Sequence, residues 1–180
     1  VYEFLERYSG YVHADAAPGY DGLYKSSPRI EVACWAHTRR KFYNACSTEP
    51  VIGRAALAWI RRLYDVEDAV RGRPPNEIKE VRQERAKPVL VEFEPWLRSV
   101  QPSVLPKGPM GGAIQYALNN WCALTRYVDV GILDIDNNLA KRMLRAVAVG
   151  RKNWLFVGND SGGHNAAVHF TLVQTCKRIH

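Results

Sequence analysis

The sequence has no long apolar run, no internal repeat and no low-complexity tract. No apolar stretch approaches the roughly 18–20 residues that a membrane-spanning helix needs. The N-terminal segment VYEFLERYSG mixes both charge signs with apolar residues, unlike a secretory signal peptide. These absences argue against a membrane-spanning or secreted protein, and we expect a cytoplasmic protein that makes no membrane contact.

Cysteine is scarce, and the four cysteines lie far apart, at Cys34, Cys46, Cys122 and Cys176. They form no CxxC pair and no cysteine–histidine pair at the spacing of metal ligands. The sequence therefore shows no zinc motif or disulfide framework, and we expect free, buried thiols. What is present is an ordinary globular composition, with 47% hydrophobic and 24% charged residues among 180, enough for one domain with a core.

Acidic residues are scarce in two basic tracts. The chain carries 25 Lys and Arg against 18 Asp and Glu, a formal net charge of +7. Residues 137–159 hold five basic residues and no acid, and residues 37–62 hold six basic residues against Glu49 alone. Such tracts are typical of surfaces that line a phosphate backbone, although a solvated helix face has the same pattern.

Two short strands are expected near the N-terminus. The alternating segment YVHAD (11–15) predicts a strand that ends at Asp15, and turn residues follow over 17–22. RIEVACWA (29–36) predicts a second, largely buried strand, and the chain continues as a helix over 37–46.

Helices are expected over most of the remaining chain. Apolar residues at helical spacing predict three stripes within 49–130, separated by RGRPPN (71–76) and by a linker over 101–112. The aromatic residues of these stripes are interpreted as core. Asp136 is expected to cap the next helix, and a turn at 159–163 is expected before a final amphipathic helix.

Five segments carry long and uncommon motifs: GYVHADAAPGYDGLY (10–24), EVACWAHTRRKFYNA (31–45), RGRPPNEIKEVRQERAKPVL (71–90), PKGPMGGAIQYALNNWCALTRYVDVGILDIDNN (106–138) and DIDNNLAKRMLRAVAVGRKNWLFVGNDSGG (134–163). Together they span nearly the whole chain and resemble the insertion sequence 66 family of bacterial transposases. The resemblance implies an α/β fold, namely the second half of an RNase H-like (retroviral-integrase-like) DDE domain with a mostly helical insertion. Residues 1–48 would then form the strand–turn–strand–helix part of the core, 49–130 the helical insertion, and 131–180 the C-terminal helices.

The resemblance also implies DNA transposition by Mg²⁺-dependent strand transfer, in which three acids hold two metal ions about 4 Å apart. Asp15 matches the family's second acid and is expected to be catalytic and a metal ligand. The first aspartate is expected on a strand upstream of this sequence. Lys141 stands where the family motif DNNxAERxLR has the third acid. Because one carboxylate cannot hold two Mg²⁺ ions and an ammonium repels them, we expect a truncated, catalytically deficient transposase.

Four basic residues match the family's basic stretch around the third acid and are expected to contact the DNA of the insertion-element ends: Arg142, Arg145, Arg151 and Lys152. They need no metal to bind phosphate, so DNA binding can outlast catalysis. One alternative is a non-catalytic DNA-binding or subunit-interaction remnant that modulates an intact transposase through a mixed oligomer. Assembly as a homo-oligomer is also possible. A third alternative is a decaying reading frame whose product has no function. A transposase and a DNA-binding remnant would both be nucleoid-associated proteins of bacteria.

Overall fold

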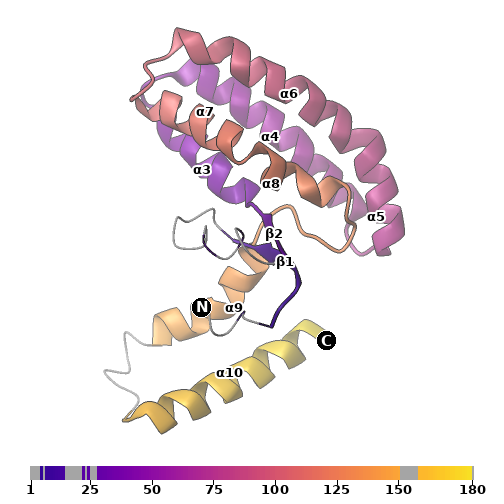
Figure 1. The fold of residues 1–180 in the computed structure, drawn as a ribbon, viewed down its shortest axis with the longest axis vertical. Helices are drawn as coiled ribbons and strands as arrows, with labels where there is room; N and C mark the ends of the chain where they lie inside the picture. Colours follow the sequence, from indigo (N-terminus) through magenta and orange to yellow (C-terminus); the bar gives the residue numbers. More distant parts are fainter. Residues whose placement is uncertain are drawn as a thin grey trace. The chain divides into compact units, whose positions relative to one another are not determined.

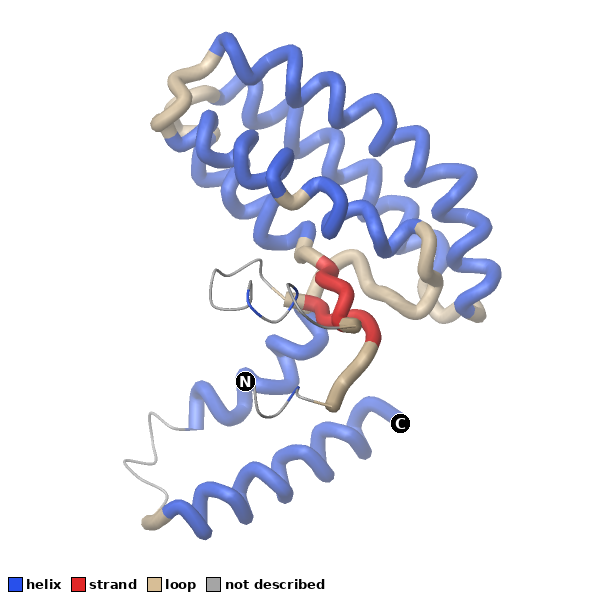
Figure 2. The backbone as a smooth tube through the Cα atoms, in the orientation of Figure 1, coloured by secondary structure: helices blue, strands red, loops and turns tan. Residues whose placement is uncertain are grey.

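The computed structural model describes residues 5, 7–14, 22, 24, 28–150 and 158–179. The chain divides into two compact units, residues 1–137 and residues 138–180. The described residues are mostly helical and include two strands (Figures 1 and 2). None of the described helices is long and apolar enough to cross a membrane.

The two strands are short and parallel. β1 (Gly10–His13) pairs with β2 (Arg29–Val32), with Gly10 opposite Arg29 and His13 opposite Val32. The predicted strand over 29–36 was too long, because α3 (Trp35–Ala45) begins where the apolar run continues. A short buried apolar run has the same periodicity in a strand and in a helix, which explains the error.

A helical layer follows β2 in the first unit (Figure 1). Its elements are α3 (Trp35–Ala45), α4 (Pro50–Val70), α5 (Pro75–Val81), the π-helical turn η2 (Arg82–Ala86), α6 (Lys87–Val100), the short 3-10 turn η3 (Gln101–Ser103), α7 (Pro109–Asn119), α8 (Trp121–Thr125) and the 3-10 turn η4 (Arg126–Val128). The predicted break at 71–76 is confirmed, since α4 ends at Val70 and α5 begins at Pro75.

The three predicted apolar stripes are confirmed as core. The fully buried members include Ile60 and Leu63 of α4, Phe93 of α6, and Ile114 and Leu124 on α7 and α8. Aromatic rings gather around Phe93, whose centroid lies 5.7–6.1 Å from the rings of four tryptophans: Trp35, Trp59, Trp96 and Trp121. The interpretation of these aromatic residues as packing residues is therefore also confirmed.

Prolines mark where several helices begin, and two predicted boundaries were wrong. α4, α5 and α7 each have proline in their first turn, where the missing N–H costs no hydrogen bond. The predicted linker over 101–112 therefore ends early, because α7 starts at Pro109 and takes Gly111 and Gly112 into the helix. The predicted turn at 159–163 is likewise helical in its last four residues.

The second unit contains α9 (Asn138–Gly150) and α10 (Asp160–Ile179). On α9 Leu139, Met143 and Val147 are half-buried, whereas Leu144 and Val149 are exposed. No side chain described on α10 is fully buried. The apolar faces of both helices are thus only partly covered within this unit.

Candidate functional site

The predicted site residues fall into two groups. Lys141, Arg142 and Arg145 lie on α9 and are described. Asp15, Arg151 and Lys152 lie outside the described residues, so their predicted roles stay predictions.

The three predicted site residues that the structure describes lie on one helix, α9, which carries no acid. Lys141 is half-buried, and Arg142 and Arg145 are exposed. Residues three apart on a helix are neighbours, so the two guanidinium groups extend from adjacent turns of one surface. An acid-free helix with two exposed arginines presents positive charge, which suits a phosphate backbone.

The carboxyl end of β1 is the described structure nearest in sequence to Asp15, and the carboxyl end of β2 pairs with it. The parallel pairing continues past β1, since the Ala14 amide donates to the carbonyl of Val32 at 3.0 Å. Beyond β2, the Ala33 amide donates to the carbonyl of Ala123 at 3.0 Å, and the Trp35 amide donates to the carbonyl of Ile135 at 3.2 Å. The end of β2 is therefore tied both to α8 and to the segment that leads into α9.

Asp136, which lies in that segment and was expected to cap the next helix, also contacts α4. α9 begins at Asn138, two residues later, and the Asp136 carboxylate accepts a hydrogen bond from the Tyr64 hydroxyl of α4 at 2.8 Å. Burial raises the pKa of the Tyr64 hydroxyl, and the charge of Asp136 and the hydrogen bond to it raise this pKa further. Tyr64 therefore remains a protonated donor that holds Asp136 over the whole physiological pH range.

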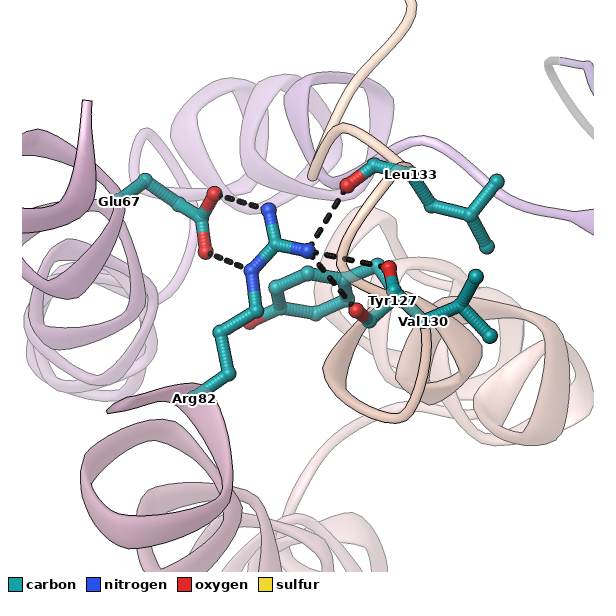
Figure 3. Close-up of polar contacts among 5 residues, drawn as sticks. All are labelled: Glu67, Arg82, Tyr127, Val130 and Leu133. Atoms are coloured by element: carbon teal, nitrogen blue, oxygen red, sulfur yellow. Dashed lines mark hydrogen bonds and ion pairs between the residues drawn. The ribbon is translucent and has the colours of Figure 1, made fainter. Parts of the chain in front are cut away.

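Arg82, in the π-helical turn η2, binds the same segment more extensively (Figure 3). Its Nε donates to Glu67 Oε1 at 2.8 Å and its Nη2 to Glu67 Oε2 at 2.5 Å. Its Nη1 donates to three carbonyl oxygens, those of Tyr127 at 3.0 Å, Val130 at 3.3 Å and Leu133 at 2.8 Å. The Arg82 side chain is 3% exposed and that of Glu67 15%, so the guanidinium is a buried cation with a full set of acceptors.

The helical layer thus holds residues 127–137 at several points. Gln83 adds hydrogen bonds from its Nε2 to the carbonyl of Val128 at 3.0 Å and to Asp129 Oδ1 at 2.7 Å. Sequence reasoning missed these contacts, although one signal was present. Arg82 lies four residues after Ile78 and four before Ala86 on an apolar stripe, and arginine at such a position is rarely buried without a partner.

The described residues do not form a metal site. No group of three or more His, Cys, Asp or Glu among them is arranged to hold a metal ion. The cysteines are free, as expected, but only Cys34 is fully buried, whereas Cys122 and Cys176 are exposed. Burial raises the pKa of the Cys34 thiol, which keeps it protonated.

The chain is similar in sequence to a known protein family. A family model described as "Transposase IS66 family" matches residues 1–165. Among similar proteins of Sinorhizobium fredii, uncharacterized protein y4qI is 35% identical over 186 residues, covering 98% of this chain and 34% of that protein. Uncharacterized protein y4hP is 30% identical over 190 residues, covering 96% and 34%. The chain thus spans about a third of the length of these relatives. No solved structure matches it.

Proposed function

Because the chain belongs to the Transposase IS66 family, we propose that it is part of a DNA-transposition protein that binds the ends of an insertion element without cutting them. In this proposal residues 1–48 and 131–180 belong to an RNase H-like DDE domain, and residues 49–130 are its helical insertion. Lys141 carries the argument, because it places an ammonium where the family's strand-transfer chemistry uses a carboxylate.

The lysine at position 141 does not fit the metal chemistry of the family. Mg²⁺ prefers hard oxygen ligands, commonly two or more carboxylates with water and phosphate. An ammonium at the third position supplies no ligand and repels the cation. Asp15 is proposed as the family's second acid, and Lys141 then places an ammonium where the metal ions need a further carboxylate. We therefore assign no metal-dependent step to this chain.

DNA binding depends on the basic residues around Lys141. Arg142 and Arg145 are exposed on α9, and Arg151 and Lys152 follow in the sequence. Guanidinium groups bind phosphate through charge and paired hydrogen bonds, and neither needs a metal ion. The partner proposed is the duplex DNA of the insertion-element ends.

A titration of duplex DNA affinity against salt concentration tests this proposal. Each phosphate that is neutralised contributes about −0.9 to the slope of log affinity against log salt. Replacing Arg142, Arg145, Arg151 and Lys152 together with alanine is expected to flatten the slope by up to about 3–4 units. An unchanged slope would remove this surface from the DNA interface. Metal-dependent cleavage by the unmodified chain that disappears in Asp15→Asn would contradict the catalytic deficiency.

A second candidate function is interaction with an intact transposase subunit. The observation that favours it is the exposure of apolar residues in the second unit, with Leu144 64% and Val149 53% exposed on α9. Apolar side chains left uncovered on a helix are suited to a protein partner. A mixed oligomer in which this chain lowers the strand-transfer rate of an intact transposase would support this function.

A further inference from the structure

We propose that the outward side of α3 is a second DNA-binding surface, with the major groove of duplex DNA as its partner. This α3 face consists of Arg39, Arg40, Tyr43 and Asn44. The inference rests on the proposed DNA binding but assigns it to a different unit of the chain, residues 1–137.

The two sides of α3 differ sharply in burial. Trp35, Thr38, Phe42 and Ala45 are all 0% exposed and fix the helix against the core. All four residues of the α3 face are exposed, and Tyr43 is 62% exposed, which is unusual for a large aromatic side chain. The face is therefore available to a partner within the described part of the chain.

The spacing of the α3 face brings different chemical groups together. Arg40, Tyr43 and Asn44 are related by three and four residues, so they are neighbours on the helix surface. Arg39 lies four residues before Tyr43 and is its neighbour on the helix surface. An arginine fork binds phosphate or guanine, an asparagine amide pairs with adenine, and a tyrosine ring stacks or donates a hydrogen bond. These are the side chains that DNA-reading helices use.

The arginines of the α3 face form no ion pair within the described residues. Among the ion pairs of the described residues, none involves Arg39 or Arg40, whereas three other exposed arginines have carboxylate partners at 2.5–2.7 Å: Arg61, Arg71 and Arg98. An arginine that already binds a carboxylate loses that partner when it turns to a phosphate. The α3 arginines have no such competing contact.

Acidic residues are also distributed away from this face. Eight of the 18 acids lie within 65–94, and none lies within 32–48, 50–64 or 95–128. These acid-free segments contain α3, the first two thirds of α4, and α7 and α8, and α3 packs on both α4 and α7 (Figure 1). Glu49, in the turn between α3 and α4, is the one acid between these segments before residue 65. The flanks of α3 on α4 and α7 therefore attract a polyanion, whereas Asp134 and Asp136 lie beside its first turn.

The helix has a suitable size and a rigid support. Its 11 residues span about 16 Å, and a major groove about 12 Å wide admits an α-helix. Trp35 anchors its first turn, because its Nε1 donates to the carbonyl of Leu124 at 2.8 Å. A rigid helix presents its outward side chains without a large loss of conformational entropy on binding.

Salt titrations of duplex affinity, followed by fluorescence anisotropy of a labelled DNA, test the assignment. Arg39→Ala/Arg40→Ala is expected to reduce the slope by about 1.8. Between about 50 and 200 mM salt, the affinity of this variant should therefore fall by about tenfold less than the affinity of the unmodified chain. Arg39→Lys/Arg40→Lys should keep the slope. Arg71→Ala/Arg98→Ala removes the same charge from ion-paired positions and is the matched control, which should leave the slope unchanged.

The outcomes separate this inference from the proposed function. An unchanged slope in Arg39→Ala/Arg40→Ala, with an unchanged thermal midpoint, overturns the α3 surface. If the substitutions around Lys141 still flatten the slope, DNA binding by α9 stands. Equal flattening by the matched control also overturns it, because net charge would then explain the effect. Tighter binding of single-stranded DNA of the same length overturns the major-groove assignment. Absence of salt-dependent binding by the unmodified chain overturns both proposals.

Discussion

Replacing Arg82 with methionine is expected to destabilise the first unit strongly. Methionine keeps much of the side-chain volume and removes the guanidinium, so the effect reports the charge and hydrogen bonds rather than a large cavity. The Glu67 carboxylate, 15% exposed, then loses its counter-ion, and three carbonyls of the following segment lose their donor.

The size of the effect follows from what stays buried. Removing one partner of a buried ion pair typically costs about 3–5 kcal/mol, because the other charge remains without compensation. Each carbonyl that loses its donor and stays dry adds about 1–3 kcal/mol, although movement of the segment toward water lowers that figure. We expect a loss of about 3–5 kcal/mol in the free energy of unfolding, against a typical total of about 5–15 kcal/mol.

A double substitution separates the orphaned charge from the lost hydrogen bonds. Glu67→Met/Arg82→Met removes both charges, and it is expected to be about 1–2 kcal/mol more stable than Arg82→Met alone. Urea unfolding followed by tryptophan fluorescence measures these differences, and hydrogen exchange over 127–137 reports whether the segment opens. A loss below about 1 kcal/mol in Arg82→Met, or additive effects in the double variant, would refute the reasoning.

Two further predictions concern Lys141 and the cysteines. Lys141→Glu is expected to strengthen binding of Mn²⁺, measured by calorimetry, because it exchanges a repelling ammonium for a ligand. It is not expected to produce strand transfer in a gel assay, and strand transfer by this single variant would show that the remaining acids suffice. A thiol reagent at pH 8 should modify Cys122 and Cys176 rapidly and leave Cys34 unmodified until the protein unfolds, since burial both shields Cys34 and raises its pKa. Rapid modification of Cys34 itself in the folded protein, mapped by mass spectrometry, would contradict its burial.

The helical layer was predictable from the sequence because a helix face is encoded locally. The apolar stripe that includes Ile60 and Leu63 follows from residue spacing alone, and the break after Val70 follows from glycine and prolines. The strand boundary at Val32 was not predictable, because buried apolar residues look alike in a strand and in a helix start.

The candidate site was predictable only in part. Motif resemblance predicts site roles for Lys141 and the arginines that follow it, and these roles stay predictions. Periodicity does not indicate which distant residues pair. The contact of Tyr64 with Asp136 spans 72 residues, and that of Arg82 with Leu133 spans 51. Such pairings depend on how the helices pack in three dimensions, which no local pattern specifies.

The separation between Arg82 and its acceptors also orders events during synthesis of the chain. Glu67 is already made when Arg82 emerges, so the ion pair can form within the first helices. The carbonyl of Leu133 is made 51 residues later, which takes about 3–10 s at typical translation rates. Over that interval the nascent helical layer carries a cation that lacks three of its five acceptors, the carbonyls of Tyr127, Val130 and Leu133. Docking of residues 127–133 is therefore the step that completes this layer.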